Sequence, residues 1–192
     1  MGTEQPNSRG RLSLLLIAAM AVAPIAAAWA LYNFWRPTAF TNYGQLLPPA
    51  PIGDVAVGQP DGGSFALSEF RGKWVILTVD SGACDDFCRQ KLYQMRQVRL
   101  TQGKDMERIE LTWLIDDGTR PSSELVAEYE GTRIVPARGS PMLSRLPADA
   151  SVRDHIYIVD PLGNLMMRYP RDADASKIRQ DVIRLLKVSG VG

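Results

Sequence analysis

The sequence predicts an α/β domain with a central mixed sheet flanked by helices, preceded by one transmembrane helix. Residues 12–35 contain no charged residue and exceed the roughly 18 to 20 apolar residues that cross a bilayer as a helix. Residues 74–79 (WVILTV) form an unbroken apolar and β-branched run, which is typical of a strand covered on both faces. Strand-like and helix-like segments then alternate, and the chain closes with a strand pair and a helix.

The composition limits the domain count and the class of partner. The chain has 192 residues, of which 45% are hydrophobic and 22% charged, so it has room for one membrane segment and one globular domain. The formal net charge is +1 and the charges are scattered, which excludes the basic stripe of a nucleic-acid-binding protein. Only two cysteines, Cys84 and Cys88, and one histidine, His155, are available for metal or thiol chemistry.

The residues that flank the apolar segment indicate its orientation. Arg9 and Arg11 precede it and Arg36 alone closely follows it, so the positive-inside bias keeps the N-terminus in the cytoplasm. The globular domain then faces the periplasm of a bacterial-type inner membrane. A cleaved signal peptide is the alternative, because the alanines at 26–28 offer a small-residue cleavage site. We favour the anchor because the apolar run exceeds the roughly 7 to 15 residues of a signal core.

We therefore divide the chain into four parts: a cytoplasmic N-terminus (1–11), a transmembrane helix (12–35), a proline-containing linker (36–50) and a globular domain (51–192). The linker is expected to be a semi-extended tether because it contains several prolines.

The globular domain is expected to fold in the order hairpin, βαβα, ββα. The predicted elements are a hairpin within 52–67 around QPDGG, strands at 74–79 and 109–115, helices at 85–101 and 122–130, strands at 156–159 and 165–169 joined by DPLGN, and a helix at 173–188. This order is that of a thioredoxin-like fold. In the helix at 85–101 we expect the cationic residues to form a solvated face: Arg89, Lys91, Arg96 and Arg99.

Cys84 and Cys88 lie where the central strand ends and the next helix begins, which is where sheet folds place their ligand crevices. A helix N-terminus stabilises a thiolate over a thiol. Asp85 and Asp86 oppose that effect but favour a bound cation, so the local electrostatics incline toward metal binding.

The sequence is also compatible with a disulfide between these cysteines. Residues four apart on a helix have Cβ atoms about 5 to 6 Å apart, whereas a relaxed disulfide needs roughly 3.5 to 4.5 Å. The Cys84–Cys88 bond therefore requires an unwound first turn and is expected to be comparatively reducible. A purely structural disulfide is the alternative in an oxidising compartment, although the loop that it closes is too short to stabilise the fold much.

The donor set also restricts the metal. Two thiolates and one imidazole suit Cu(I) and accommodate Cu(II) with a further ligand, whereas structural zinc normally takes four protein ligands. His155 begins the segment HIYIV, at the strand junction that a thioredoxin-like fold brings beside the cysteine turn. A hydrogen-bonded histidine without a metal is the alternative for this position.

Three segments carry a resemblance to a known family: GKWVILTVDSGACDDFC, WLIDDGTRPSSELVAEYEG and DHIYIVDPLGNLMMRYP. With the N-terminal anchor, they resemble the Sco/SenC family of membrane-tethered, thioredoxin-like copper proteins that assist cytochrome c oxidase assembly. The resemblance covers most of 51–188. It departs from the family at Asp85, where a proline is usual, and at His155, which lies a few residues nearer the DPLG turn.

The resemblance implies that Cys84, Cys88 and His155 bind copper, as Cu(I) or Cu(II), and that the two cysteines form a thiol redox pair. The implied partner is the copper-bearing subunit of cytochrome c oxidase or its assembly factors, at the periplasmic side of the inner membrane. Asp116 and Asp117 are expected to line the approach to the site.

Three hypotheses remain open from the sequence: a copper chaperone, a thiol–disulfide oxidoreductase without stable metal binding, and a non-catalytic assembly scaffold with a structural disulfide. The copper chaperone is favoured. Because an oxidoreductase would be an enzyme and a chaperone would not, the sequence leaves open whether the protein is an enzyme.

Overall fold

A computed structural model describes residues 8–34, 42–52, 57–58 and 64–190. The chain divides into two compact units, Met1–Thr41 and Asn42–Gly192. The first unit contains α1 (Ser8–Phe34), which continues through Pro24. Its segment Gly10–Asn33, with a hydropathy of 2.3, is the one helix among the described residues that is long and apolar enough to cross a membrane. The predicted apolar helix is therefore confirmed, and it begins a few residues earlier than expected.

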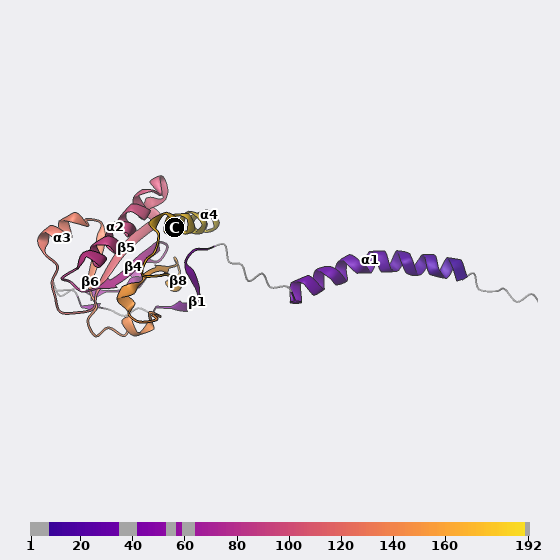
Figure 1. Cartoon of the computed structure of the whole chain (residues 1–192), viewed down its shortest axis with the longest axis horizontal. Coiled ribbons are helices and arrows are strands. Elements are labelled where there is room, and N and C mark those ends of the chain that lie inside the picture. Colours follow the sequence, from indigo (N-terminus) through magenta and orange to yellow (C-terminus); the bar gives the residue numbers. More distant parts are fainter. Residues whose placement is uncertain (1–7, 35–41, 53–56, 59–63, 191–192) are drawn as a thin grey trace, which may run out of the picture. The chain divides into compact units, whose positions relative to one another are not determined.

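The second unit is built on a six-stranded sheet in the order β1-β8-β7-β4-β5-β6 (Figure 1). Its strands are β1 (Gln45–Pro51), β4 (Trp74–Asp80), β5 (Ile109–Ile115), β6 (Thr132–Pro136), β7 (Ile156–Val159) and β8 (Asn164–Tyr169). β4, β5 and β6 are parallel, whereas β7 runs antiparallel to β4, and β8 runs antiparallel to both β7 and β1. The predicted mixed sheet is confirmed.

β4 is the buried strand that positions the site. All seven of its residues are buried, as the run WVILTV predicts. Leu77 and Val79 point into one core cluster, and Trp74 and Ile76 point into a second cluster on the opposite face. Residues on both faces of β4 are therefore shielded from water, and its C-terminal end is held firmly at the edge where the cysteines follow.

Two long helices cover one face of the sheet. These are α2 (Asp86–Leu100) and α4 (Ala175–Val188), which pack against each other and against the sheet (Figure 1). Met95 and Val98 of α2 share a core cluster with Ile178 and Val182 of α4. The opposite face is covered by shorter segments that contribute Ile52, Phe70, Met142 and Leu146. A third helix, α3 (Ser123–Glu128), follows β5 and is shorter than the predicted 122–130.

The predicted hairpin at the start of the domain is present as a small separate sheet. β2 (Val57–Gly58) and β3 (Ser64–Phe65) pair antiparallel. The turn between them, 59–63, lies outside the described residues.

The predicted end of the linker is wrong. Residues 45–50 belong to β1, which pairs with β8 with Gln45 opposite Arg168. Pro48 and Pro49 suggested a tether, but an edge strand tolerates proline because one side of its backbone has no ladder partner. The pairing shifts register between Leu46 and Ala50, around these two prolines.

Candidate functional site

The cysteine turn is built by a tight turn that leads into a capped helix. After β4 the N–H of Cys84 donates to the carbonyl of Ser81 at 3.1 Å. Cys84 has a φ of +44°, in the left-handed region, and Asp85 returns to extended geometry as the N-cap of α2. The Asp85 side chain accepts a hydrogen bond from the N–H of Cys88 at 2.9 Å. Cys84 therefore lies outside the helix, and Cys88 lies in its first turn.

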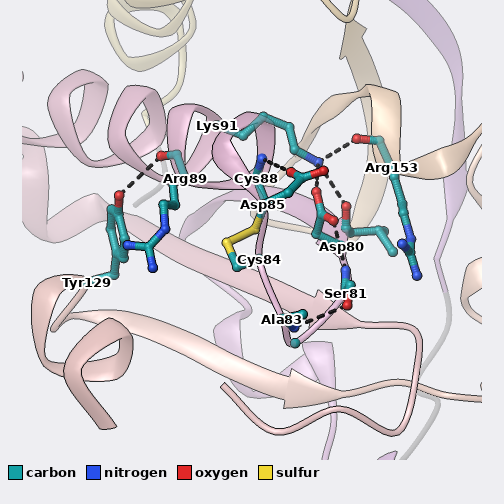
Figure 2. Close-up of a disulfide and its surroundings, with 12 residues drawn as sticks. Asp80, Ser81, Ala83, Cys84, Asp85, Cys88, Arg89, Lys91, Tyr129 and Arg153 are labelled. Atoms are coloured by element: carbon teal, nitrogen blue, oxygen red, sulfur yellow. Dashed lines mark hydrogen bonds and ion pairs between the residues drawn. A yellow bond between two sulfur atoms is a disulfide. The ribbon is translucent and has the colours of Figure 1, made fainter. Parts of the chain in front are cut away.

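This geometry joins the two cysteines in a disulfide (Figure 2). Their Cα atoms are 5.1 Å apart, within the usual range for such a bond. The sequence predicts an unwound first turn for such a bond, but the first turn of α2 is intact; the helix begins at Asp86, and the left-handed Cys84 before it lets the two sulfurs meet. The relative ease of reduction stays a prediction.

The disulfide is buried. Cys84 is 3% exposed and Cys88 is fully covered. The side chains that pack in the same cluster come from α2, β5 and the α3 region: Leu92, Trp113, Ile115, Leu125 and Tyr129. The Tyr129 hydroxyl donates to the carbonyl of Arg89 at 3.2 Å, which ties the α3 region to α2 (Figure 2). A partner thiol therefore has to displace covering side chains before it reaches the sulfur atoms.

A buried ion pair lies next to the cysteine turn. The Lys91 ammonium is 2.7 Å from the Asp80 carboxylate, and it donates to the carbonyl oxygens of Val79 at 2.9 Å and Arg153 at 2.5 Å (Figure 2). Burial lowers the pKa of Lys91, and the hydrogen bond and charge of Asp80 oppose that shift. The other Asp80 oxygen accepts from the N–H of Ser81 at 2.8 Å, which fixes the start of the turn.

The end of β5 holds the other side of the turn. Arg153 donates two hydrogen bonds to Asp116, at 2.8 and 2.7 Å. Asp117 accepts from the N–H groups of Gly82 at 3.2 Å and Thr119 at 2.9 Å. Its pKa is lowered to about 2, chiefly by a hydrogen bond with the Ser81 side chain. The two aspartates thus lie beside the cysteine turn and fix it in place.

His155 lies in a buried, hydrogen-bonded environment. It is 5% exposed, its Nδ1 lies 2.8 Å from the carbonyl of Tyr169, and its ring packs edge-on against Tyr157. Nε2 is buried without a hydrogen-bond partner in the described structure. Side chains alternate along a strand: Ile156 packs with residues of α2, whereas Tyr157 packs on the opposite face of the sheet. The His155 ring contacts the Tyr157 ring, and among the described residues no hydrogen bond or ring contact joins it to Cys84 or Cys88.

The predicted three-ligand set is consequently not assembled in this disulfide state. Within the described ranges, which include Cys84, Cys88 and His155, no three His, Cys, Asp or Glu residues are grouped so that they could hold a metal. The cysteines meet each other, while His155 is engaged with a backbone carbonyl. The two sulfurs gain metal-binding capacity only as thiolates, after reduction. A ligand role for His155 stays a prediction.

Two family models match the chain. The description "Transmembrane-like, thioredoxin-like, C-terminal domain" matches residues 74–189, and "Transmembrane-like, N-terminal domain" matches 5–35. The chain belongs to this transmembrane-like, thioredoxin-like family. No protein with a curated description matches the sequence.

Solved structures that are similar to this chain confirm its fold. Apo Sco1 from Thermus thermophilus matches with a TM-score of 0.58 and 20% identity, covering 77% of this chain and 99% of that one. Copper-bound ScoI from Bradyrhizobium japonicum matches at 0.53 and 15% identity, covering 70% and 99%. The thioredoxin domain of a thiol-disulfide oxidoreductase from Bacteroides vulgatus matches at 0.50 and 15% identity, covering 77% and 99%. The Sco/SenC resemblance is thus confirmed in the fold.

The most deeply buried charge at the cysteine turn, that of Lys91, was not recognised from the sequence. Lys91 was expected on a solvated cationic face, and that prediction is wrong because it is 2% exposed. Lys91 is buried because it pairs with the Asp80 carboxylate, which comes from β4 and cannot be recognised from the sequence of the helix alone. The position of Lys91 was a usable signal. It comes three residues after Cys88 and directly before Leu92, which places it at the border of the apolar face of the helix.

Proposed function

We propose that this protein is a membrane-anchored thiol–disulfide redox protein whose Cys84–Cys88 pair alternates between disulfide and dithiol. The observation that carries the proposal is the disulfide itself, formed between a left-handed residue before α2 and the first turn of that helix. A structural role alone explains it poorly, because a bond across four positions closes a loop too short to stabilise the fold much.

The geometry also distinguishes the two sulfurs. Cys84 lies outside the helix and retains slight exposure, whereas Cys88 is completely covered. A partner thiolate attacks Cys84, forms a mixed disulfide and releases Cys88 as a thiolate. A second partner thiolate then resolves the mixed disulfide. The exchange transfers two electrons and two protons, so that the partner becomes a disulfide and the pair becomes a dithiol; the reverse exchange, with a disulfide of another protein, oxidises the pair again.

Copper handling is the second candidate function. Solved Sco structures of the same fold carry bound copper, among them those from Bradyrhizobium japonicum and yeast. Once reduced, Cys84 and Cys88 supply two soft thiolates that suit Cu(I) as a cargo. The nitrogen of His155 that is available as a third ligand is Nε2, because Nδ1 lies at the Tyr169 carbonyl and Nε2 has no hydrogen-bond partner in the described structure. The proposed target of either activity is the copper-bearing subunit of cytochrome c oxidase or its assembly factors.

Two measurements on the full-length chain in detergent separate these functions. The oxidised fraction of the pair is measured in dithiothreitol and glutathione buffers, with Cys84→Ser and Cys88→Ser as controls. The reduced protein is then titrated anaerobically with Cu(I) against a chromophoric chelator. Reversible equilibration without competitive copper binding supports the redox function. One tight equivalent that is lost in Cys84→Ser and weakened in His155→Ala supports copper handling.

We also propose that α1 is an uncleaved anchor of the inner membrane, with the globular unit in the periplasm. The support is the match to the transmembrane-like N-terminal model and the apolar span Gly10–Asn33. Alkaline extraction should leave the full-length chain in the membrane pellet, and protease added to spheroplasts should degrade the globular unit. A soluble product that begins after residue 28 would instead indicate a cleaved signal peptide.

A further inference from the structure

The N-cap of α2 accepts a hydrogen bond from the backbone N–H of Cys88, one of the two cysteines of the redox pair. The first four N–H groups of a helix have no partner within the helix, and they carry the positive end of its dipole. In α2 the N–H of Cys88, the third residue of the helix, donates to the Asp85 carboxylate at 2.9 Å (Figure 2). The Cys84 sulfur is bonded to the side chain of the same Cys88, so after reduction the Cys84 thiolate starts close to the N–H group that the Asp85 carboxylate already occupies.

This competition affects the two redox states differently. In the disulfide, the sulfur of Cys84 is neutral and a weak acceptor, so the bond from Cys88 to Asp85 is made without loss. After reduction, a Cys84 thiolate is stabilised by helix N–H groups and destabilised by a nearby negative charge. Asp85 both occupies one such donor, the N–H of Cys88, and supplies that charge.

The cations around the turn offset only part of the Asp85 charge, because each already has a carboxylate partner, although the charge of Asp85 also helps to raise the pKa of Lys91. Figure 2 shows Lys91, Arg153 and Arg89 around the disulfide. Their ion pairs are Lys91 with Asp80, Arg153 with Asp116 and Arg89 with Glu128.

We propose that Asp85 is a positioning residue that shifts the redox equilibrium of the Cys84–Cys88 pair toward the disulfide, which makes the reduced pair an electron donor. The inference rests on the proposed redox function and specifies its direction. The dithiol passes two electrons and two protons to a partner disulfide, which becomes a dithiol, while Cys84 and Cys88 are oxidised. A dithiol protein must then reduce the pair again.

The test measures the equilibrium constant of the full-length chain in detergent against dithiothreitol, read as the oxidised fraction after acid quenching and alkylation. Asp85→Ala removes the charge and the cap acceptor. Asp85→Asn keeps a cap acceptor and removes only the charge, since Asn caps as well as Asp. Asp86→Asn is the matched control, because it removes an equal charge one residue further along, on an exposed residue that is not the cap.

We expect Asp85→Ala to shift the equilibrium toward the dithiol by about tenfold, which is about 30 mV for a two-electron couple. Asp85→Asn and Asp86→Asn should shift it by about threefold or less, as expected for a partly screened charge. Equal shifts in Asp85→Ala and Asp86→Asn would overturn the inference, since the cap bond would then contribute nothing. If Asp85→Ala does not fold, Asp85→Gly provides the same comparison, because Gly lacks the acceptor but costs a helix start only a little.

The wild-type result separates this inference from the proposed function. If the wild-type pair equilibrates with dithiothreitol and the three variants coincide with it, only the role of Asp85 fails. If the wild-type disulfide stays intact at every dithiothreitol concentration under native conditions, the redox function fails and the inference fails with it.

Discussion

The ammonium of Lys91 and the carboxylate of Asp80 form an ion pair of 2.7 Å with side-chain exposures of only 3% and 6%. The same ammonium donates to carbonyls of Val79 and Arg153, so one side chain of α2 joins the end of β4 to the segment before β7. These are the segments that surround the cysteine turn. The pair therefore stabilises the position of the redox site as well as the core.

Replacing Asp80 with asparagine should strongly destabilise the fold. The substitution leaves the buried Lys91 charge without its paired carboxylate, and breaking a buried ion pair in this way typically costs about 3 to 5 kcal/mol. Urea denaturation of the full-length chain in detergent measures the free energy of unfolding. The control is Glu128→Gln, which breaks the exposed ion pair with Arg89 and should cost about 0 to 1 kcal/mol. Equal losses in the two variants would contradict the prediction.

The double variant Asp80→Asn, Lys91→Met tests whether the two charges are coupled. It removes both ions at once, so its loss of unfolding free energy should be smaller than the sum of the two single losses by at least about 1 kcal/mol. Additive losses would show that the buried charges do not stabilise each other.

A second buried carboxylate fixes the start of the globular unit. Asp181 of α4 is 1% exposed and accepts hydrogen bonds from the N–H of Tyr43 at 3.0 Å, the N–H of Gly44 at 2.8 Å and the hydroxyl of Tyr169 at 3.4 Å. Asp181→Ala leaves these donors without their acceptor and should lower the free energy of unfolding by about 3 kcal/mol.

Urea denaturation checks that loss, and hydrogen exchange should show faster exchange of the amides at residues 43–44. Asp172→Ala is the control, because Asp172 is exposed and the change should stay within about 0.5 kcal/mol. Unchanged exchange at 43–44 in Asp181→Ala would show that these amides depend on another contact.

The elements that sequence patterns identified are those whose signal is local. β5 was predicted with its observed bounds, 109–115, and β7 with its bounds, 156–159, because short runs rich in apolar, β-branched and aromatic residues mark a strand. β1 was missed because Pro48 and Pro49 are typical of a linker, and only pairing with β8 makes that segment a strand. β6 was missed because TRIVP is short and lies on the sheet edge beside β5.

The same distinction applies to the candidate site. Cys84 and Cys88 were predicted because they are close in the sequence and follow a recognisable strand. The burial of Lys91 depends on Asp80 in another element, and the environment of His155 depends on the Tyr169 carbonyl of β8. Such contacts join residues that are far apart in the chain, so no local pattern in a single sequence identifies them.

Gly82 should tolerate no side chain. A Cβ atom at this position would lie 1.9 Å from the carbonyl oxygen of Thr119, a backbone atom that cannot move aside alone. Gly82→Ala therefore separates the cysteine turn from the loop after β5 and weakens the bond from its N–H to Asp117. Overpacking of this kind costs about 1 to 3 kcal/mol.

The measurements for Gly82→Ala are urea denaturation and the rate at which dithiothreitol reduces the disulfide, which should rise because the turn is less well covered. Gly190→Ala is the control, because a Cβ there would meet no atom within 4 Å. A Gly82→Ala variant with wild-type stability and reduction rate would contradict the packing of the turn.

Asp117 should contribute stability that is lost in acid. Its pKa is about 2 in the folded chain and 3.8 without these contacts, with the Ser81 side chain as the main cause. As pH falls, the unfolded state takes up this proton first, so the contribution is complete above pH 4 and disappears as pH falls toward 2. The shift corresponds to about 2 kcal/mol at 1.36 kcal/mol per unit. Because the side chain is 31% exposed, we expect about 1 kcal/mol after solvent screening.

Asp117→Asn isolates this group from the other carboxylates, which titrate in both proteins. The free energy of unfolding is measured by urea denaturation at intervals from pH 5 to pH 2. The wild-type chain should be more stable than Asp117→Asn by about 1 kcal/mol at pH 5, and the difference should vanish as the pH approaches 2 because the Asp117 carboxylate becomes protonated. A difference that stays constant would show that the contacts with Ser81, Gly82 and Thr119 do not depend on the charge of Asp117.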